Sequence, residues 1–215
     1  MNKTGLIRLL FALLVTGFCL WFHNGEAARA QQTDLEKELR DHDKSVSDDK
    51  LERVRSEARS IQSAIISRVR ERFPQYELES QYFSDPANQA IGRRGQTRFD
   101  SSWRSPDKTQ IRLNITFAFD ADEANRMHRK SADGIAMGEF FRAPDFVGTE
   151  GILVKNVQFN KKTTNVGLHF VKGRAIVMSY ITDQSRATNK NEKELIEFVR
   201  AIAPLIIAKE NFNDL

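Results

Sequence analysis

One ten-residue segment, Gln110–Phe119, constrains the fold of this chain more than any other. Every second position carries an apolar side chain: Ile111, Leu113, Ile115, Phe117 and Phe119. Polar or small residues fill the positions between them. Because successive side chains of a strand point to opposite sides of a sheet, the segment predicts a strand with one buried face. The chain must therefore build a sheet whose apolar face is covered by other elements.

Further strands are expected at 97–103, 152–159, 164–171 and 174–182. The first of them places Phe99 and Trp103 on one face. The turn Ser105–Lys108 joins it to the strand at 110 as a hairpin, and turns at Asn160–Lys162 and Lys172-Gly173 join the last three strands. Consecutive hairpins predict a mostly antiparallel sheet.

A helix is predicted over 47–72, where apolar residues recur at spacings of three and four. Ser47 can cap its N-terminus, and Pro74 supplies the stop. The apolar stripe consists of Leu51, Val54, Ala58, Ile61, Ile65 and Val69. We interpret it as the face that packs on the domain that follows. The alternatives are a coiled coil or a partner-docking helix, or a helix whose arginine-rich end, 53–72, lies on an anionic membrane.

Two more helices are expected. A capping box of Asp120 and Glu123 predicts a helix over 120–133. Its inward side chains are Ala124, Met127 and Ala132. The last helix is capped by Asn189 or Asn191 and ends at the next proline. Its buried stripe is Leu195, Phe198, Val199 and Ile202.

The expected order is therefore helix, two strands, helix, three strands, helix, in one domain without an internal repeat. We predict an α+β fold in which helices cover a mostly antiparallel sheet. In this order of elements, residues 73–205 resemble the small exported domains of the Mog1/PsbP-like group. The resemblance consists of element order alone. It implies a compact domain used for binding or assembly rather than catalysis, and it transfers no functional residue.

The first 30 residues are typical of a secretory signal peptide. Lys3 and Arg8 precede the fourteen-residue apolar run Leu9–Phe22, and the small-x-small site Ala28-Arg29-Ala30 follows. We therefore expect cleavage after Ala30 and a periplasmic or secreted location. The alternative is an uncleaved N-terminal membrane anchor with the domain outside the cytoplasm, although a spanning helix needs about 20 residues. Cys19 follows Phe18, where a lipid-attachment site would need a small residue.

After residue 30 the chain is expected to contain four parts: a charged flexible tether at 31–46, the amphipathic helix at 47–72, the α+β domain at 73–205 and a C-terminal tail at 206–215. The tether has few apolar side chains to offset the entropy of ordering. Without residues 1–30 the chain keeps 30 basic and 28 acidic side chains. This near balance argues against nucleic acid as a partner, and a membrane contact is expected only through an uncleaved residue 1–30 segment.

No catalytic, cofactor or metal site is predicted. The chain after residue 30 has no cysteine, and its three histidines are scattered. His42 lies in the tether and His128 lies among basic residues on a helix. His169 alternates with apolar neighbours and is expected to point away from the core, into solvent. A serine nucleophile at Ser101 or Ser102 would need one of the histidines as a base, and we expect no enzyme.

The segment 134–151 contains four glycines and several large apolar residues, and it is expected to be an irregular loop. Long irregular loops in compact domains are often binding elements. The candidate lip for a partner or ligand consists of Met137, Phe140, Phe141, Arg142 and Phe146. The interpretation that we favour, however, is that Phe140 and Phe141 plug an open end of the core, with the lip as the alternative. A turn at 92–95 also offers Arg93 and Arg94 as a contact for an anion.

Together these features predict an exported, non-catalytic binding or assembly domain of the bacterial cell envelope. The alternatives are a membrane-anchored accessory subunit of an envelope complex, or a carrier of a small apolar ligand. An extracytoplasmic hydrolase is the least favoured reading, because it would need residues that converge only in three dimensions.

Overall fold

The computed structural model describes residues 46–85, 87, 95–133, 139–147, 151–159, 163–183 and 189–209. The chain divides into two compact units, Met1–Ser45 and Val46–Leu215, and all described residues belong to the second. The predicted signal segment and nearly all of the tether, with His42, therefore lie outside the described residues. Within the described ranges, no helix is both long and apolar enough to cross a membrane.

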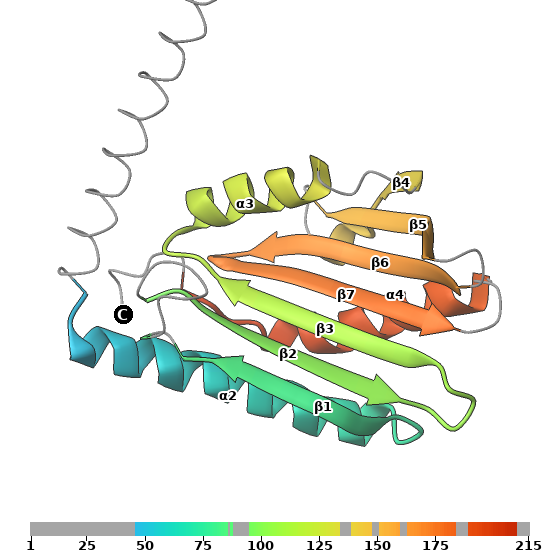
Figure 1. The fold of residues 1–215 in the computed structure, drawn as a ribbon, viewed down its shortest axis with the longest axis horizontal. Coiled ribbons are helices and arrows are strands. Elements are labelled where there is room, and N and C mark those ends of the chain that lie inside the picture. The colour runs from blue at the N-terminus through green and yellow to red at the C-terminus, as the bar shows by residue number, and fades with distance from the viewer. Residues whose placement is uncertain are drawn as a thin grey trace, which may run out of the picture. The chain divides into compact units, whose positions relative to one another are not determined.

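The described part contains one sheet of seven strands in the order β1-β2-β3-β7-β6-β5-β4 (Figure 1). The strands are β1 (Glu77–Ser84), β2 (Thr97–Arg104), β3 (Gln110–Phe117), β4 (Glu139–Arg142), β5 (Ile152–Phe159), β6 (Thr163–Lys172) and β7 (Ala175–Asp183). Every neighbouring pair is antiparallel. The predicted α+β class with an antiparallel sheet is confirmed.

Helix α2 (Asp48–Arg72) forms as the spacing of its apolar residues predicts. The Ser47 side chain accepts a hydrogen bond from the Lys50 backbone N–H at 3.3 Å, and the helix ends two residues before Pro74. All six residues of the predicted stripe are buried. The interpretation that this stripe packs on the following domain is confirmed, because its C-terminal part, from Ala58 to Val69, belongs to the core cluster of the sheet. The stripe is therefore not available for a coiled coil.

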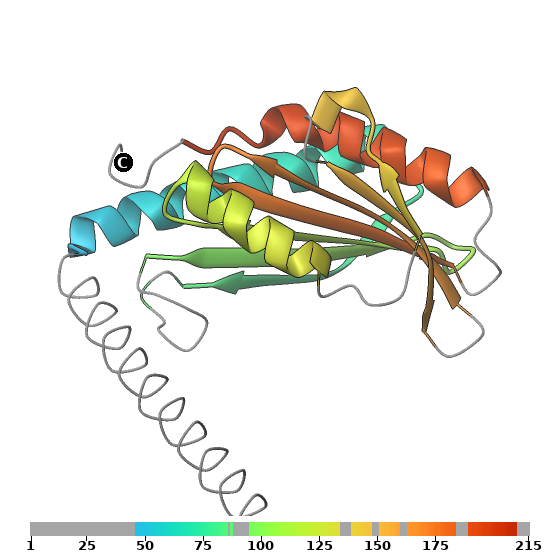
Figure 2. The ribbon, with the colours of Figure 1, turned by 90° about the horizontal axis from the view of Figure 1, so that it is seen from above.

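Helices α2 and α4 (Asn189–Ile202) lie side by side behind the sheet, on the face that we call the inner face (Figure 2). The core between them contains the inner side chains of the strands and of α4. Its largest aromatic contact joins Trp103 and Phe198, whose ring centroids are 5.4 Å apart. The 3-10 turn Ala203–Leu205 follows α4. The core also includes Ile206, which was expected to begin a C-terminal tail.

Helix α3 (Ala121–Asp133) packs on the opposite face, which we call the outer face, and it covers only β6 and β7. The Glu123 backbone N–H donates to Asp120 Oδ1 at 2.6 Å, while the Glu123 carboxylate accepts from the Phe119 N–H at 2.8 Å. This reciprocal pair confirms the predicted helix start. The buried Ala124 contacts a small apolar cluster with Ile176.

Two strands of the sheet are missing from the sequence prediction, and both are edge strands. β1 exposes most of its side chains on both faces, so its sequence has no alternating pattern. β4 has only four residues and lies inside the segment 134–151, which was expected to be wholly irregular. That expectation was wrong, because Phe140 and Phe141 pair with Val154 and Leu153 of β5 in an antiparallel ladder.

Two details at the helix starts also differ. Asn189 is already the first residue of α4, so Asn191 lies within the first turn, and its side chain is buried rather than capping from outside. Val46, expected to end the flexible tether, is 4% exposed and packs with Leu51, Val54 and Phe119. Val46 is therefore part of the packed domain, one residue before the predicted helix cap.

Candidate binding surface

The lip residues predicted in 134–151 are only partly within the described residues. Met137 lies outside them, and of Phe140 only the backbone is described, in β4. Phe141 is 43% exposed, with the Lys155 ammonium 4.6 Å from its ring centroid. Phe146 is half-buried against the core, below the Arg200 guanidinium.

The arginines among the predicted contacts have different outcomes. Arg142 is exposed and donates to Asp145 at 3.0 Å. Arg93 and Arg94, the candidate anion contact, lie outside the described residues. The structure therefore brings Phe141 and Arg142 to one exposed edge and turns Phe146 toward the core.

The outer face of β1, β2, β3 and β7 carries a hollow of about 680 Å³ that sequence reasoning missed. This part of the outer face lies beside the part that α3 covers and faces the viewer in Figure 1. We call its outward side chains the polar face. They are Glu79, Ser80, Arg98, Asp100, Ser102, Arg104, Gln110, Arg112, Asn114, Met178 and Tyr180.

Three polar side chains form a buried floor in this hollow. Ser102, Gln110 and Asn114 are 7%, 9% and 8% exposed, although no helix among the described residues covers them. They are short or medium side chains: Gln110 and Asn114 lie on either side of Arg112 along β3, and Ser102 of β2 is the register partner of Arg112. Longer charged side chains surround them. The arrangement is a polar floor with a charged rim, which differs from a flat solvated sheet face.

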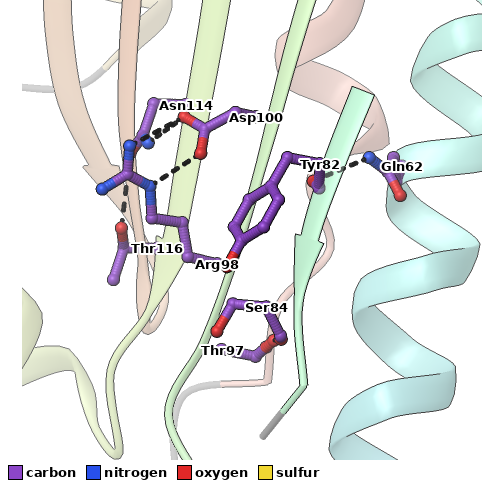
Figure 3. A network of polar contacts seen from close by, with 8 residues as sticks. All are labelled: Gln62, Tyr82, Ser84, Thr97, Arg98, Asp100, Asn114 and Thr116. Carbon is purple, nitrogen blue, oxygen red and sulfur yellow. Dashed lines mark hydrogen bonds and ion pairs between the residues drawn. The ribbon is translucent and has the colours of Figure 1, made fainter. Parts of the chain in front are cut away.

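The rim is built from one ion pair along β2 and one that joins β2 to β1. Arg98 donates twice to Asp100, at 2.9 and 3.0 Å, and the Asn114 amide donates to the same carboxylate (Figure 3). At the other end Arg104 donates to Glu79 at 2.8 Å. These contacts hold the rim in one geometry, since bidentate arginine–carboxylate pairs fix direction as well as distance.

Glu79 shows the electrostatic effect of this rim. The hydrogen bond from Arg104 holds the pKa of Glu79 below its ordinary value, and a hydrogen bond from Gln110 and the charge of Arg112 act in the same direction. Glu79 lies in β1 where the pairing register shifts between Leu78 and Ser80. This bulge turns an extra side chain of the edge strand toward the hollow.

Tyr180 closes the hollow on the β7 side. Its ring lies over Gly167 of β6, so close that a Cβ at Gly167 would be 2.9 Å from the ring carbons Cδ1 and Cε1. The His169 ring meets it edge-on, with centroids 5.0 Å apart. Burial raises the pKa of Tyr180 to about 12, so its hydroxyl stays protonated and can donate a hydrogen bond.

The prediction that His169 points into solvent was wrong. His169 does face away from the inner core, as its alternation predicts, but α3 covers this part of the outer face and leaves it 1% exposed. Burial, together with a smaller effect of the nearby His128, lowers the pKa of His169 to about 4. Neither ring nitrogen of His169 has a hydrogen-bond partner among the described residues.

The strand order separates His169 from the serines that could use it as a base. Ser101 and Ser102 lie on β2, and His169 lies on β6, three inter-strand steps away. At about 4.8 Å per step the separation is roughly 14 Å, whereas a general base needs hydrogen-bond reach. Within the described ranges, no three His, Cys, Asp or Glu side chains are grouped to hold a metal ion.

A second hollow, of about 590 Å³, lies between the end of α2 and the start of α4. Its lining includes Arg72, Lys193 and Glu197, which are exposed side chains on helix surfaces. Tyr76 donates to Glu194 at 2.8 Å beneath it. This hollow has no floor of buried, uncovered polar groups, so we place the candidate site on the polar face.

The polar face was missed because each of its strands, taken alone, has an ordinary solvated side. A signal was present in the hairpin: Arg98, Asp100 and Arg104 share one face of β2, and Arg112 shares it on β3. No protein-family model matches the chain, and no curated protein and no solved structure matches it either. The site is therefore argued from its own geometry.

Proposed function

We propose that this chain is an exported, non-catalytic binding or assembly domain of the bacterial cell envelope, with the polar face as its binding surface. Export is supported by the signal-like first 30 residues. The observation that carries the binding assignment is the floor of the hollow, where Ser102, Gln110 and Asn114 are buried although no helix in the described part of the chain covers them. Binding sites place a few polar groups in a concave surface in this way.

The distribution of stability supports the same surface. The fold is held by the inner face, where α2 and α4 cover the apolar side chains of the sheet. The polar face contributes little to that core, so the charged residues of its rim can be substituted without loss of the fold. Function on a folded scaffold resides in such a site rather than in the fold.

Photo-crosslinking tests the proposal in the cells that make the protein. Tyr82 is 50% exposed at the rim of the polar face, and Ser63 is an exposed residue of α2. Each is replaced by p-benzoylphenylalanine, and adducts are read by intact mass so that small and large partners are both detected. We expect adducts from position 82 and none from position 63.

The variant Ser102→Trp supplies the second half of the test, because an indole on the floor fills the hollow. We expect it to remove the adduct from position 82, with circular dichroism showing an unchanged fold. An adduct that forms equally at both positions, or that survives Ser102→Trp, would overturn the polar face as the binding surface. The absence of any adduct at position 82 would do the same.

The proposal also covers a membrane-anchored accessory subunit, which differs only in whether residues 1–30 stay attached. Intact mass of the protein from membrane and soluble fractions distinguishes the two. A chain that begins at Gln31 in the soluble fraction supports a free domain. A full-length chain in the membrane fraction with stoichiometric partners supports the anchored subunit.

A further inference from the structure

We infer that the hollow binds a small molecule of about dipeptide size through one carboxylate, and that Arg112 is the residue that holds this carboxylate. The inference rests on the proposed binding function of the polar face. It names the ligand class, which the function alone leaves open. It is argued from the charges of the rim, the donors around Arg112 and the acids that flank it.

The charge balance of the polar face leaves Arg112 as the available cation. The face carries three arginines and two carboxylates. Arg98 is bound to Asp100, and Arg104 is bound to Glu79. Arg112 donates its Nε–H to the Gln110 side chain at 2.9 Å, and within the described residues its two terminal nitrogens meet no acceptor. Arg112 therefore brings two terminal guanidinium nitrogens without a partner among the described residues to the lining of the hollow.

A hydroxyl lies beside Arg112 in the same row across the sheet. Ser102 is its register partner on β2, whereas the Tyr180 ring on β7 leans over Gly167 of β6 and its hydroxyl donates to Met178 Sδ at 3.9 Å. Ser102 is in turn bonded to Ser80, with their oxygens 2.7 Å apart. An oxyanion at the guanidinium can therefore accept an additional hydrogen bond from a group that the sheet already holds in place. Charge-assisted hydrogen bonds of this kind are about twice as strong as neutral ones.

The flanking acids favour a monoanion over a phosphate dianion. Glu79 lies near enough to Arg112 for the arginine charge to lower its pKa, so Glu79 stays ionised. Asp100 occupies the other flank, fixed by Arg98 and Asn114. With one cation in excess, the face neutralises one negative charge, and a second would be repelled by both acids. The same two acids accept hydrogen bonds, which suits a ligand that carries amide N–H groups.

The size of the hollow agrees with this ligand class. Its volume of about 680 Å³ lies within the roughly 300–1,000 Å³ of small-molecule sites. Acetyl-Gly-Gly with a free carboxylate is therefore a suitable probe. Its C-terminal amide is the matched neutral molecule, and inorganic phosphate is the matched dianion.

The test is an NMR titration that follows the Arg112 Nε–H and the backbone amides of β2, β3 and β7 at constant ionic strength. We expect the carboxylate probe to bind with a Kd on the order of 1 mM, at least about tenfold more tightly than its amide and than phosphate. Arg112→Gln should weaken the binding of the carboxylate probe at least about tenfold, which corresponds to about 1.4 kcal/mol. It should leave the binding of the amide unchanged. Arg70→Gln, the same charge change on the exposed side of α2, should have no effect.

Four results would each overturn the inference. The first two are equal binding of the acid and the amide, and tighter binding of phosphate. The others are no change in the signals of these residues, and an Arg112→Gln variant that binds the acid normally. The crosslinking experiment separates this failure from that of the proposed function. An adduct at position 82 that Ser102→Trp removes would leave the polar face as the binding surface, with only its ligand class wrong. Arg112→Lys adds a geometric control, because the lysine ammonium keeps the positive charge but lacks the paired, planar N–H donors of the guanidinium.

Discussion

The inner and outer sides of β2 and β3 are made by alternate residues of the same strands, yet they have different tasks. The inner side buries Phe99, Trp103 and Ile115 at 0–1% exposure under α2 and α4. The outer side carries Arg98, Asp100 and Arg112 around a hollow. Apolar burial on one side supplies the stability of the sheet. This lets the other side hold charges that contribute little to folding, and the predictions below exploit that contrast.

The largest difference is expected between adjacent positions 103 and 102. Trp103→Ala removes a fully buried ring that contacts Phe198, and it should lower the free energy of unfolding by about 4 kcal/mol. Ser102→Ala loses one hydrogen bond to Ser80 and should cost only about 1 kcal/mol. Urea denaturation of the two variants measures both values. Similar losses for both would contradict the assignment of stability to the inner face.

The next effect concerns the ion pair that joins α2 to the turn between β6 and β7. Arg174 is fully buried, donates to Glu57, and its Nη1 also donates to the Ala118 carbonyl at 3.0 Å. Arg174→Met removes the cation that is paired with Glu57, leaves this carboxylate only the Lys209 backbone N–H at 3.1 Å, and should cost about 3 kcal/mol. Adding Glu57→Met should recover most of that loss, while Arg70→Met on the exposed side of α2 serves as the neutral control. A double variant as unstable as the single one would show that packing, not charge, sets the cost.

The covered part of the outer face should respond to acid. The pKa of His169 is lowered to about 4 from an ordinary 6.5, so between these values the unfolded chain binds the proton that the folded chain excludes. Stability is therefore full above pH 6.5 and falls as the pH drops toward 4, by on the order of 3 kcal/mol. His169→Phe should flatten this part of the curve. The lowered pKa of Asp85 and Asp107 gives a separate loss at lower pH, which the variant should retain.

The sequence predicts the inner side of the sheet well, because apolar residues that are buried on one face recur at regular spacings along the chain. The alternation at 110–117 and the stripe of α2 both correspond to buried side chains. Where a residue is buried by an element from another part of the chain, the local sequence shows no such periodic pattern. His169 is buried by α3, and β1 is a strand only because β2 pairs with it. The polar face could have been inferred only by combining the outer sides of β2 and β3 in the register of their hairpin.

A smaller effect is expected at Gly167, which links the two parts of the outer face. A Cβ there would meet the Tyr180 ring at 2.9 Å, so Gly167→Ala must shift that ring. We expect a loss of about 1 kcal/mol and weaker binding of the carboxylate probe, because Tyr180 also lines the hollow on its β7 side. Unfolding curves and the NMR titration measure the two parts. In a Tyr180→Ala background, Gly167→Ala should no longer cost stability, because the ring that its Cβ would meet is gone.

The smallest effect on stability is expected at Phe141, the exposed part of the predicted lip. Its ring contacts the Lys155 ammonium, and exposed contacts of this kind are worth about 0.5–1 kcal/mol. Phe141→Ser should therefore leave the fold intact, as thermal melting can verify. If it also leaves the adduct at position 82 unchanged, the polar face binds without the lip. Loss of that adduct would make the edge at β4 part of the same binding surface.

Radical footprinting tests most directly whether the polar face is the surface that the protein uses. Tyr82 on the rim and Phe141 at the opposite edge are 50% and 43% exposed, so they react as matched reporters in the purified protein. Oxidation of both is compared between the purified protein and the protein in its native envelope. We predict that Tyr82 becomes protected in the envelope while Phe141 does not. Protection of Phe141 with an unchanged Tyr82 would contradict the assignment and return the binding surface to the lip.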